Sequence, residues 1–210
     1  MLHAMAIDGT AAYDDVEDLP PLVRQAVEVA ILEGFTNSCL PSHGRLLQVL
    51  AGGVGEGGVI GETGTGCGVG LAWLASGARG GVRLVSVERD ARLVEATRSV
   101  MSDLQGVTIV HGDWRQLRVS GPFDLLVLDG GGQGKTEEPP ISPPDWLRPG
   151  GLVVLDDFTP STTWPPLHDG QPDEARLHWL RHTQLLATQV RTQPDAVTVL
   201  GTFIGERSVP

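Results

Sequence analysis

The sequence has little positive charge. It contains 15 Lys and Arg against 26 Asp and Glu, which gives a formal net charge of −11. Proteins that bind nucleic acids need Lys and Arg surfaces to displace counterions from phosphates, and this chain has no run of basic residues. We therefore expect a small-molecule substrate and no nucleic-acid partner.

Long apolar runs and cysteines are also scarce. No uninterrupted apolar stretch approaches the roughly 18 residues that a membrane span needs, so we expect no membrane partner. The N-terminal segment is acidic and lacks the basic and then apolar pattern of a signal peptide, so a cytoplasmic location is expected. Cys39 and Cys67 give neither a disulfide framework nor a zinc spacing, and both are expected to be reduced thiols.

The pattern of apolar residues predicts an α/β fold. Residues 1–18 form a polar lead, and residues 19–53 carry two N-terminal helices, the first ending near Gly34 and the second following a turn at Pro41-Ser42. A further amphipathic helix is expected over 90–104, with Asp90 as its N-cap. Strand-like runs alternate with these connections and indicate a mostly parallel sheet that ends in an antiparallel hairpin; the runs cover 57–62, 83–89, 107–112, 123–129, 151–157, 185–190 and 196–203.

Glycine is abundant where the first of these strands ends. The stretch Val59–Gly70, VIGETGTGCGVG, fits neither the dinucleotide fingerprint G-x-G-x-x-G in any register nor a phosphate-binding P-loop. It does fit an acidic residue followed by three alternating glycines, Glu62-x-Gly64-x-Gly66-x-Gly68. A carboxylate beside the turn would repel a pyrophosphate but is compatible with the cationic amino-acid end of S-adenosylmethionine.

Carboxylates also follow the fourth and fifth strands. Asp129, Asp156 and Asp157 lie where open α/β sheets place their ligands. Three carboxylates this close would repel one another, which either raises a pKa or requires a cation. Magnesium or a similar divalent cation is the natural candidate, because it prefers oxygen ligands.

With these motifs, the sequence resembles the S-adenosylmethionine-dependent methyltransferases of the Rossmann-like class. More narrowly, it is similar to the small O-methyltransferases that include the catechol and caffeoyl-CoA O-methyltransferases, over about residues 20–204. The resemblance implies a Rossmann-like three-layer sandwich with a seven-stranded, mostly parallel sheet and a C-terminal antiparallel hairpin. It also implies a single methyltransferase domain over 1–210, whose N-terminal helices can contribute to a homodimer.

The resemblance extends to individual cofactor-binding residues. Glu62 and the glycines match the cofactor loop, Glu88 matches the carboxylate that binds the ribose hydroxyls, and residues 112–114 match the segment that contacts the adenine. Asp113 has an alternative role as the cap of a short helix that begins at Trp114. The segment 38–51 resembles the family's approach to the cofactor site. The expected S-adenosylmethionine-binding set is Glu62, Gly64, Thr65, Gly66, Gly68, Glu88, Arg89, Gly112, Asp113, Trp114 and Asp129.

The resemblance also implies metal assistance by Asp129, Asp156 and Asp157. In the metal-dependent relatives a lysine follows the fourth-strand aspartate by three residues, a position that is Gly132 here, whereas Lys135 comes six residues after Asp129. Asp129 and Lys135 are the expected catalytic residues, and His43 and His168 are alternative bases.

The expected reaction is metal-assisted methyl transfer to a hydroxyl of a small aromatic acceptor, with an acceptor pocket lined by Trp146, Phe158 and Trp164. Two alternatives stay open: a metal-independent methyltransferase acting on nitrogen or on a carboxylate, and an S-adenosylmethionine-binding module without catalysis.

Overall fold

A computed structural model describes residues 8–205. The helices are α1 (Pro21–Leu32), α2 (Pro41–Gly52), α3 (Val69–Gly77), α4 (Ala91–Met101), α5 (Pro143–Trp146) and α6 (Glu174–Leu180), together with the 3₁₀ helices η1 (Ala11–Tyr13) and η2 (Trp114–Ser120). The strands are β1 (Val59–Thr63), β2 (Arg83–Glu88), β3 (Val107–His111), β4 (Phe123–Leu128), β5 (Leu147–Phe158), β6 (Leu167–His168), β7 (Gln171–Pro172), β8 (Leu185–Gln193) and β9 (Ala196–Phe203).

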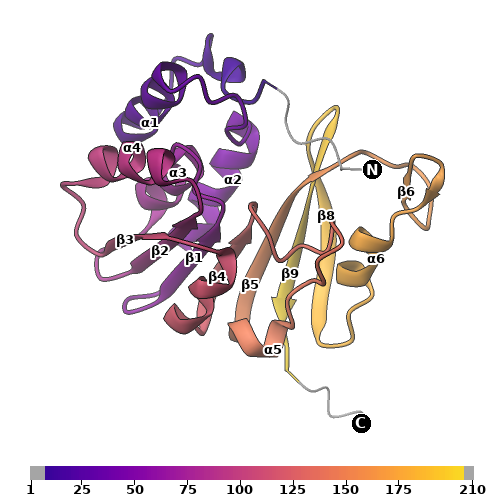
Figure 1. The fold of residues 1–210 in the computed structure, drawn as a ribbon. Helices are drawn as coiled ribbons and strands as arrows, with labels where there is room; N and C mark the ends of the chain where they lie inside the picture. The colour runs from indigo at the N-terminus through magenta and orange to yellow at the C-terminus, as the bar shows by residue number, and fades with distance from the viewer. Residues whose placement is uncertain (1–7, 206–210) are drawn as a thin grey trace.

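Seven strands form one sheet in the order β3-β2-β1-β4-β5-β9-β8 (Figure 1). The five strands β1 to β5 pair in parallel, whereas β9 pairs antiparallel with both β5 and β8. Each strand predicted from the sequence is present, and the C-terminal hairpin inserts β9 between β5 and β8. The predicted seven-stranded, Rossmann-like arrangement is therefore confirmed.

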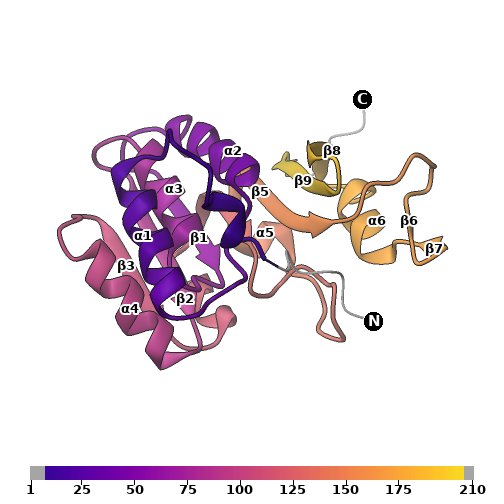
Figure 2. The ribbon, with the colours of Figure 1, turned by 90° about the horizontal axis from the view of Figure 1, so that it is seen from above.

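Two apolar clusters cover the two faces of the sheet. One cluster joins α1, α2, α3 and α4 to side chains such as Ile60 and Leu125, and the other joins η2, α5 and α6 to side chains such as Val85 and Leu126. Neighbouring residues of a strand point to opposite faces, so strands that are apolar throughout are buried on both sides. The result is three layers, with α1 to α4 together on one side of the sheet (Figure 2).

The N-terminal helices begin and end where backbone chemistry allows. Gly34 adopts a positive φ of 63°, and the amide of Phe35 donates to the carbonyl of Ala30 at 2.8 Å, which is a Schellman ending of α1. Helix α2 starts at Pro41 itself, inside the segment predicted as a turn, because proline fits the first position of a helix.

The polar lead is tied down in the part that the structure describes; residues 1–7 lie outside it. Tyr13 is buried, donates to the Cys39 carbonyl at 2.8 Å, and accepts from the Trp73 indole at 3.0 Å. Trp73 and Cys67 are also buried, since each is at most 1% exposed. Among residues 8–205, no helix has both the length and the apolar character needed to cross a membrane.

Candidate functional site

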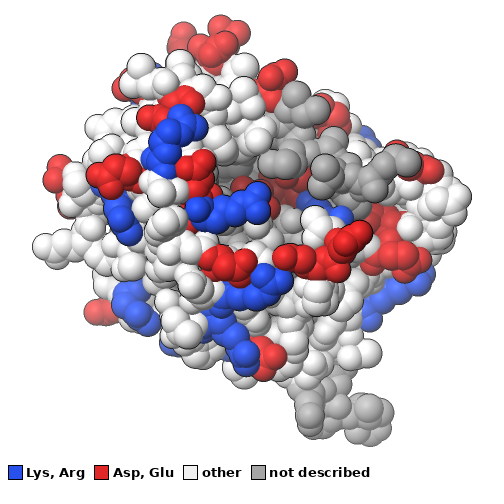
Figure 3. Space-filling view, viewed as in Figure 1, with Lys and Arg blue, Asp and Glu red and all other residues white. Residues whose placement is uncertain are grey.

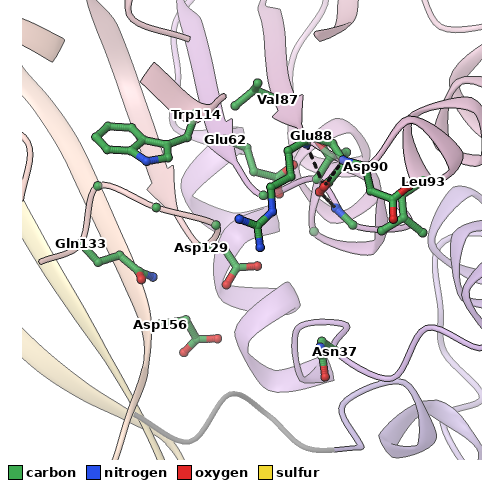
Figure 4. Close-up of a pocket in the computed structure, with 18 of the residues that line it drawn as sticks. Asn37, Glu62, Val87, Glu88, Asp90, Leu93, Trp114, Asp129, Gln133 and Asp156 are labelled. Atoms are coloured by element: carbon green, nitrogen blue, oxygen red, sulfur yellow. Dashed lines mark hydrogen bonds between the residues drawn. The ribbon is translucent and has the colours of Figure 1, made fainter. Parts of the chain in front are cut away.

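A cavity of about 760 Å³ lies at the carboxyl ends of β1, β2, β4 and β5. This is the edge at which parallel α/β sheets place their ligands. The cavity is bordered by the tips of these strands, by the segment 35–39 and by the loop 130–138. In Figure 4, Glu88 and Asp90 lie on one side of the cavity, Asp156 lies on another, and Asp129 lies between them. Of the residues predicted to bind the cofactor, to bind a metal or to act in catalysis, all except Gly68 line it, whereas the alternative bases His43 and His168 do not.

The glycine turn after β1 depends on close backbone contacts. Gly64 has a φ of 82°, and a Cβ there would lie 2.5 Å from the backbone of Gly130 after β4. Gly66 has a φ of 54° and would place a Cβ 2.8 Å from the ring of Phe35. Gly68 instead faces Thr97 of α4, so its role is to pack the turn on that helix, outside the cavity.

Glu62 is buried beneath the turn. One carboxylate oxygen accepts from the Ser86 hydroxyl at 2.6 Å, and the other lies so close to Gly70 that a Cβ there would be 2.5 Å away. Burial is the main cause that raises the pKa of Glu62 to about 8, with Glu88 adding to the effect and Ser86 opposing it. A positively charged ligand group in the cavity would favour the ionised carboxylate.

Glu88 joins the tip of β2 to the glycine turn. Its side chain accepts from the Gly66 amide and from the amides of Arg89 and Asp90, each at 2.9 Å (Figure 4). Three backbone donors fix the carboxylate in place at the wall of the cavity. Its predicted role in binding ribose hydroxyls stays a prediction.

Gly112, Asp113 and Trp114 follow the third strand, and all three line the cavity. Asp113 caps η2 by accepting from the Arg115 amide at 3.0 Å, and it also pairs with the Arg115 guanidinium at 3.1 Å. The capping role considered from the sequence is thus present, and the backbone hydrogen bond from Arg115 is the main cause that lowers the pKa of Asp113. Contact with an adenine stays a prediction.

Asp129 lies at the centre of the cavity, at the tip of β4. Its amide donates to the Thr63 carbonyl at 3.2 Å, which fixes the β4 tip against β1. Although its side chain is open to the cavity, the surrounding protein raises the pKa of Asp129 well above its usual range, and Asp157, Asp156 and Glu62 raise it further. A carboxylate whose pKa is raised is a stronger base than an ordinary aspartate.

Asp156 is held by groups from distant parts of the chain. One oxygen accepts from the Thr198 hydroxyl of β9 at 2.9 Å, and the other lies 3.2 Å from Nδ1 of His43 on α2. His43 is only 2% exposed, and burial is the main cause that lowers its pKa. The Thr198 oxygen lies 2.9 Å from Nδ1 of His43, so the ring nitrogen donates while the hydroxyl donates onward to Asp156.

Lys135 reaches this end of the cavity from the loop 130–138. Its ammonium donates to the main-chain carbonyls of Asp156 and Asp157, the latter at 3.2 Å. Burial lowers the pKa of Lys135, and the carboxylates of Asp157, Asp156 and Asp129 oppose that shift. The position six residues after Asp129 therefore does not keep Lys135 away from the aspartates.

The three aspartates do not form a set of metal ligands. Asp157 has a φ of 62°, within a break of the register between β5 and β9. One carboxylate oxygen of Asp156 accepts from Thr198, and the other lies 3.2 Å from Nδ1 of His43. Within residues 8–205, no group of three or more His, Cys, Asp and Glu side chains is arranged to hold a metal ion. The residues present thus do not fit the divalent cation that the sequence predicts.

The predicted aromatic acceptor pocket is wrong in its residues. Trp146 and Phe158 are buried in the core outside the cavity, and Trp164 is 65% exposed on the surface. His168 also lies outside the cavity, beside Asp169. The aromatic side chains that do line the cavity are Phe35 and Trp114.

Sequence reasoning missed Phe35, Asn37 and Gln133, which line the cavity, and Thr198, which holds Asp156. Phe35 had a signal, since it follows the Gly34 helix ending directly. Thr198 had none, because only the insertion of β9 beside β5 brings it to Asp156.

Charged side chains of both signs surround the hollow in the middle of the face shown in Figure 3. At the rim of the cavity, Arg115 pairs with Asp113 and with Glu138 at 3.1 Å, and its guanidinium lies over the Trp114 ring at 4.5 Å. Pairs this exposed are weak, so they set the shape of the rim more than its stability.

Comparisons with known proteins agree with this architecture. Residues 62–158 match the family described as a methyltransferase domain. The fold is similar to that of an O-methyltransferase from Bacillus cereus solved in complex with S-adenosylhomocysteine, with a TM-score of 0.67 and 18% identity over 96% of this chain and 100% of the other. It is also similar to an O-methyltransferase of Streptomyces achromogenes involved in tomaymycin synthesis, solved with S-adenosylmethionine, with a TM-score of 0.68 and 18% identity over 94% and 96% of the two chains.

A methyltransferase from Geobacter sulfurreducens gives a TM-score of 0.66 at 21% identity, over 98% of this chain and 100% of the other. No curated protein sequence matches the chain significantly.

Proposed function

The chain contains a methyltransferase domain of the S-adenosylmethionine-dependent, Rossmann-like class, and on that premise we propose that it transfers a methyl group to a hydroxyl of a small, aromatic acceptor. The observation that carries the proposal is a single cavity whose lining includes both the glycine turn with Glu88 and the group of Asp129, Lys135 and Asp156. The first end suits the donor, and the second provides proton-accepting chemistry for an acceptor. Two of the proteins with similar structures are O-methyltransferases, which supports the same reaction.

The donor end would bind S-adenosylmethionine through its charge and its hydroxyls. Glu62 lies where the cationic amino-acid end of the ligand would be favoured, and the ionised form of Glu62 would be stabilised in return. The carboxylate of Glu88 is fixed by three amides and is available to ribose hydroxyls. Gly64 and Gly66 keep the turn packed against Gly130 and Phe35 at the wall of this end of the cavity.

Transfer would then require one bond exchange and one proton transfer. The acceptor oxygen forms a bond to the methyl carbon while the bond from that carbon to sulfur breaks, which leaves S-adenosylhomocysteine. The hydroxyl proton passes to Asp129, whose raised pKa makes its ionised form a stronger base than an ordinary aspartate. Holding donor and acceptor in line within one cavity supplies much of the acceleration.

Calorimetry with S-adenosylmethionine and S-adenosylhomocysteine tests the donor claim, and no binding of either at high micromolar concentration would contradict it. A panel of catechol-type, amine and carboxylic acid acceptors, with products identified by mass spectrometry and NMR, tests the acceptor claim. If only amines or carboxylic acids are methylated, the proposed transfer to a hydroxyl is wrong and the alternative, transfer to nitrogen or to a carboxylate, is correct.

Asp129→Asn should keep binding of S-adenosylhomocysteine within about tenfold and lower kcat by about 100-fold, the usual contribution of a general base. Loss of kcat without a change in donor binding would separate catalysis from cofactor binding. If the native chain binds the donor but methylates no acceptor in the panel, the non-catalytic binding module becomes the better description.

A further inference from the structure

Lys135 is the only lysine in the chain, since every other basic residue is arginine. Its ammonium lies at the end of the cavity where Asp129, Asp156 and Asp157 meet, which is the place predicted for a divalent cation. An ammonium is a compact point charge with three donors, unlike the broad planar guanidinium. It is therefore the protein group that most closely substitutes for a small cation.

The contacts of Lys135 are those of a bound cation. Its Nζ donates to two consecutive main-chain carbonyls, those of Asp156 and Asp157. It also lies 4.3 Å from the centre of the Phe158 ring, whose face attracts positive charge. The carboxylates of Asp157, Asp156 and Asp129 all act electrostatically on it.

The loop that carries Lys135 is held in place on both sides. The Gln133 side chain donates to the Leu128 carbonyl at 2.5 Å, and the Gln133 carbonyl accepts from the fully buried Trp179 at 2.8 Å. The amide of Ile141 donates to the Gly132 carbonyl at 2.9 Å where the loop returns. The position of Lys135 is thus set by buried contacts with β4 and α6.

The carboxylate of Asp156 is directed to other partners. One of its oxygens accepts from Thr198, and the other lies 3.2 Å from Nδ1 of His43, which is buried outside the lining of the cavity. A divalent ion bound to these aspartates would also have to remain beside the Lys135 ammonium, against strong repulsion between like charges.

We propose that Lys135 is a built-in cation that takes the place of a divalent metal among Asp129, Asp156 and Asp157, so that methyl transfer proceeds without metal. The ammonium balances the carboxylates and supplies a positive field at the acceptor end of the cavity. The claim about catalysis rests on the proposed function, whereas the claim about the cation site does not.

Manganese binding, followed by electron paramagnetic resonance, tests the cation site without any turnover. Replacing the ammonium by a neutral side chain in Lys135→Gln should free the aspartates and tighten Mn²⁺ binding by at least about tenfold relative to the native chain. Adding Asp157→Asn to that variant should remove the gain. Lys135→Arg keeps the charge and is the matched control, so it should bind Mn²⁺ no better than the native chain.

The single lysine offers a second route to the same measurement. Acetylation of the native protein neutralises the Lys135 ammonium and, apart from that, only the α-amino group, so it should raise Mn²⁺ affinity as Lys135→Gln does. Peptide mass spectrometry gives the extent of modification at Lys135. This route needs no refolding of a variant, and thermal unfolding checks that each form is folded.

Two results would overturn the proposal. One is tight Mn²⁺ binding by the native chain that Asp157→Asn weakens. The other is a folded Lys135→Gln variant and an acetylated protein that both bind Mn²⁺ no better than the native chain.

For the active enzyme, chelator or added Mg²⁺ should change kcat by less than about twofold, because no metal enters the reaction. Loss of activity with chelator and recovery with Mg²⁺ would also overturn the proposal. If no acceptor is methylated, the proposed function fails while the manganese experiment still decides the cation site.

Discussion

The two ends of the cavity are assembled in different ways. At the donor end, the turn after β1 and the tip of β2 hold each other through main-chain contacts, such as those of Glu88 with the amides of Gly66 and Asp90. At the acceptor end, side chains from distant segments meet: His43 and Thr198 are 155 positions apart, and Gln133 and Trp179 are 46 apart. The donor end is therefore a property of neighbouring strand tips, and the acceptor end is a property of the whole fold.

The largest expected effect tests the backbone contact that links the two ends. Gly64→Ala places a Cβ 2.5 Å from the Gly130 backbone at a φ of 82°. We expect a loss of more than about 4 kcal/mol in the free energy of unfolding, because two backbones must separate. Gly57→Ala is the control, since Gly57 has a φ of 73° but no atom within 4 Å of an added Cβ, and it should cost only about 1 kcal/mol. Denaturant unfolding measures both, and equal losses would refute the close contact as the cause.

The second prediction concerns the buried carboxyl of the donor end. Because folding raises the pKa of Glu62 from 4.5 to about 8, the folded state retains a proton that the unfolded state releases. The contribution of Glu62 to the stability of the ligand-free protein should therefore be fully present below pH 4.5 and be lost as the pH rises toward 8, by a few kcal/mol in total. Glu62→Gln has no such titration and should be more stable than the native chain at pH 8, with no difference near pH 4.5.

Denaturant unfolding across this pH range, without and with S-adenosylhomocysteine, measures the effect. A stability difference between Glu62→Gln and the native chain that does not change with pH would contradict the assignment. The ligand should reduce the difference if its cation stabilises the ionised Glu62.

The third prediction tests whether the donor end acts alone in binding. Glu88→Ala removes three hydrogen bonds to amides and the expected ribose contact, so affinity for S-adenosylhomocysteine should fall by about 100-fold. Glu95→Ala on the exposed face of α4 is the matched control and should leave the affinity unchanged. Calorimetry measures both, and an affinity that survives in Glu88→Ala would remove Glu88 from the binding site.

The smallest effect is expected at the acceptor end. Thr198→Val keeps the shape of a fully buried side chain but removes the hydroxyl that donates to Asp156. We expect kcat to fall by about tenfold and donor affinity to stay within twofold, with about 1–3 kcal/mol lost in stability for the unpaired group. Thr188→Val on an exposed position of β8 is the control. A large loss of donor affinity in Thr198→Val would mean that the two ends are not separate.

The same division explains what could be predicted from the sequence. The strands and most residues that line the donor end of the cavity could be predicted, because each follows from a local pattern: an apolar run, a glycine turn, or an acidic residue at the end of a strand. Gly68 was predicted to bind the cofactor but packs against Thr97, outside the cavity lining. The sequence could not distinguish the two roles, because a glycine with a positive φ suits either one.

At the acceptor end, the three aspartates named from the sequence do line the cavity, but the aromatic residues predicted beside them do not. Trp146 and Phe158 are near strand ends in the chain, yet their side chains are buried in the apolar cluster that joins η2, α5 and α6 to the sheet. Asp156 accepts a hydrogen bond from Thr198 of β9, and the loop that carries Lys135 is held by Trp179 of α6. Both elements are far from Asp129 along the chain, so neither contact could be predicted from the sequence. Local sequence patterns carry no information about contacts between residues that are far apart in the chain.

The position of Trp114 allows ligand binding to be followed by tryptophan fluorescence. Of its five tryptophans, Trp114 is the one that lines the cavity, whereas Trp73, Trp146 and Trp179 are buried in the core. Its indole donates to Glu138 at 3.0 Å, so it touches the loop that carries Lys135 as well as the space for the ligand. The intrinsic tryptophan fluorescence of this protein should therefore change when a ligand enters the cavity, and Trp114→Phe is the control that should not show the change.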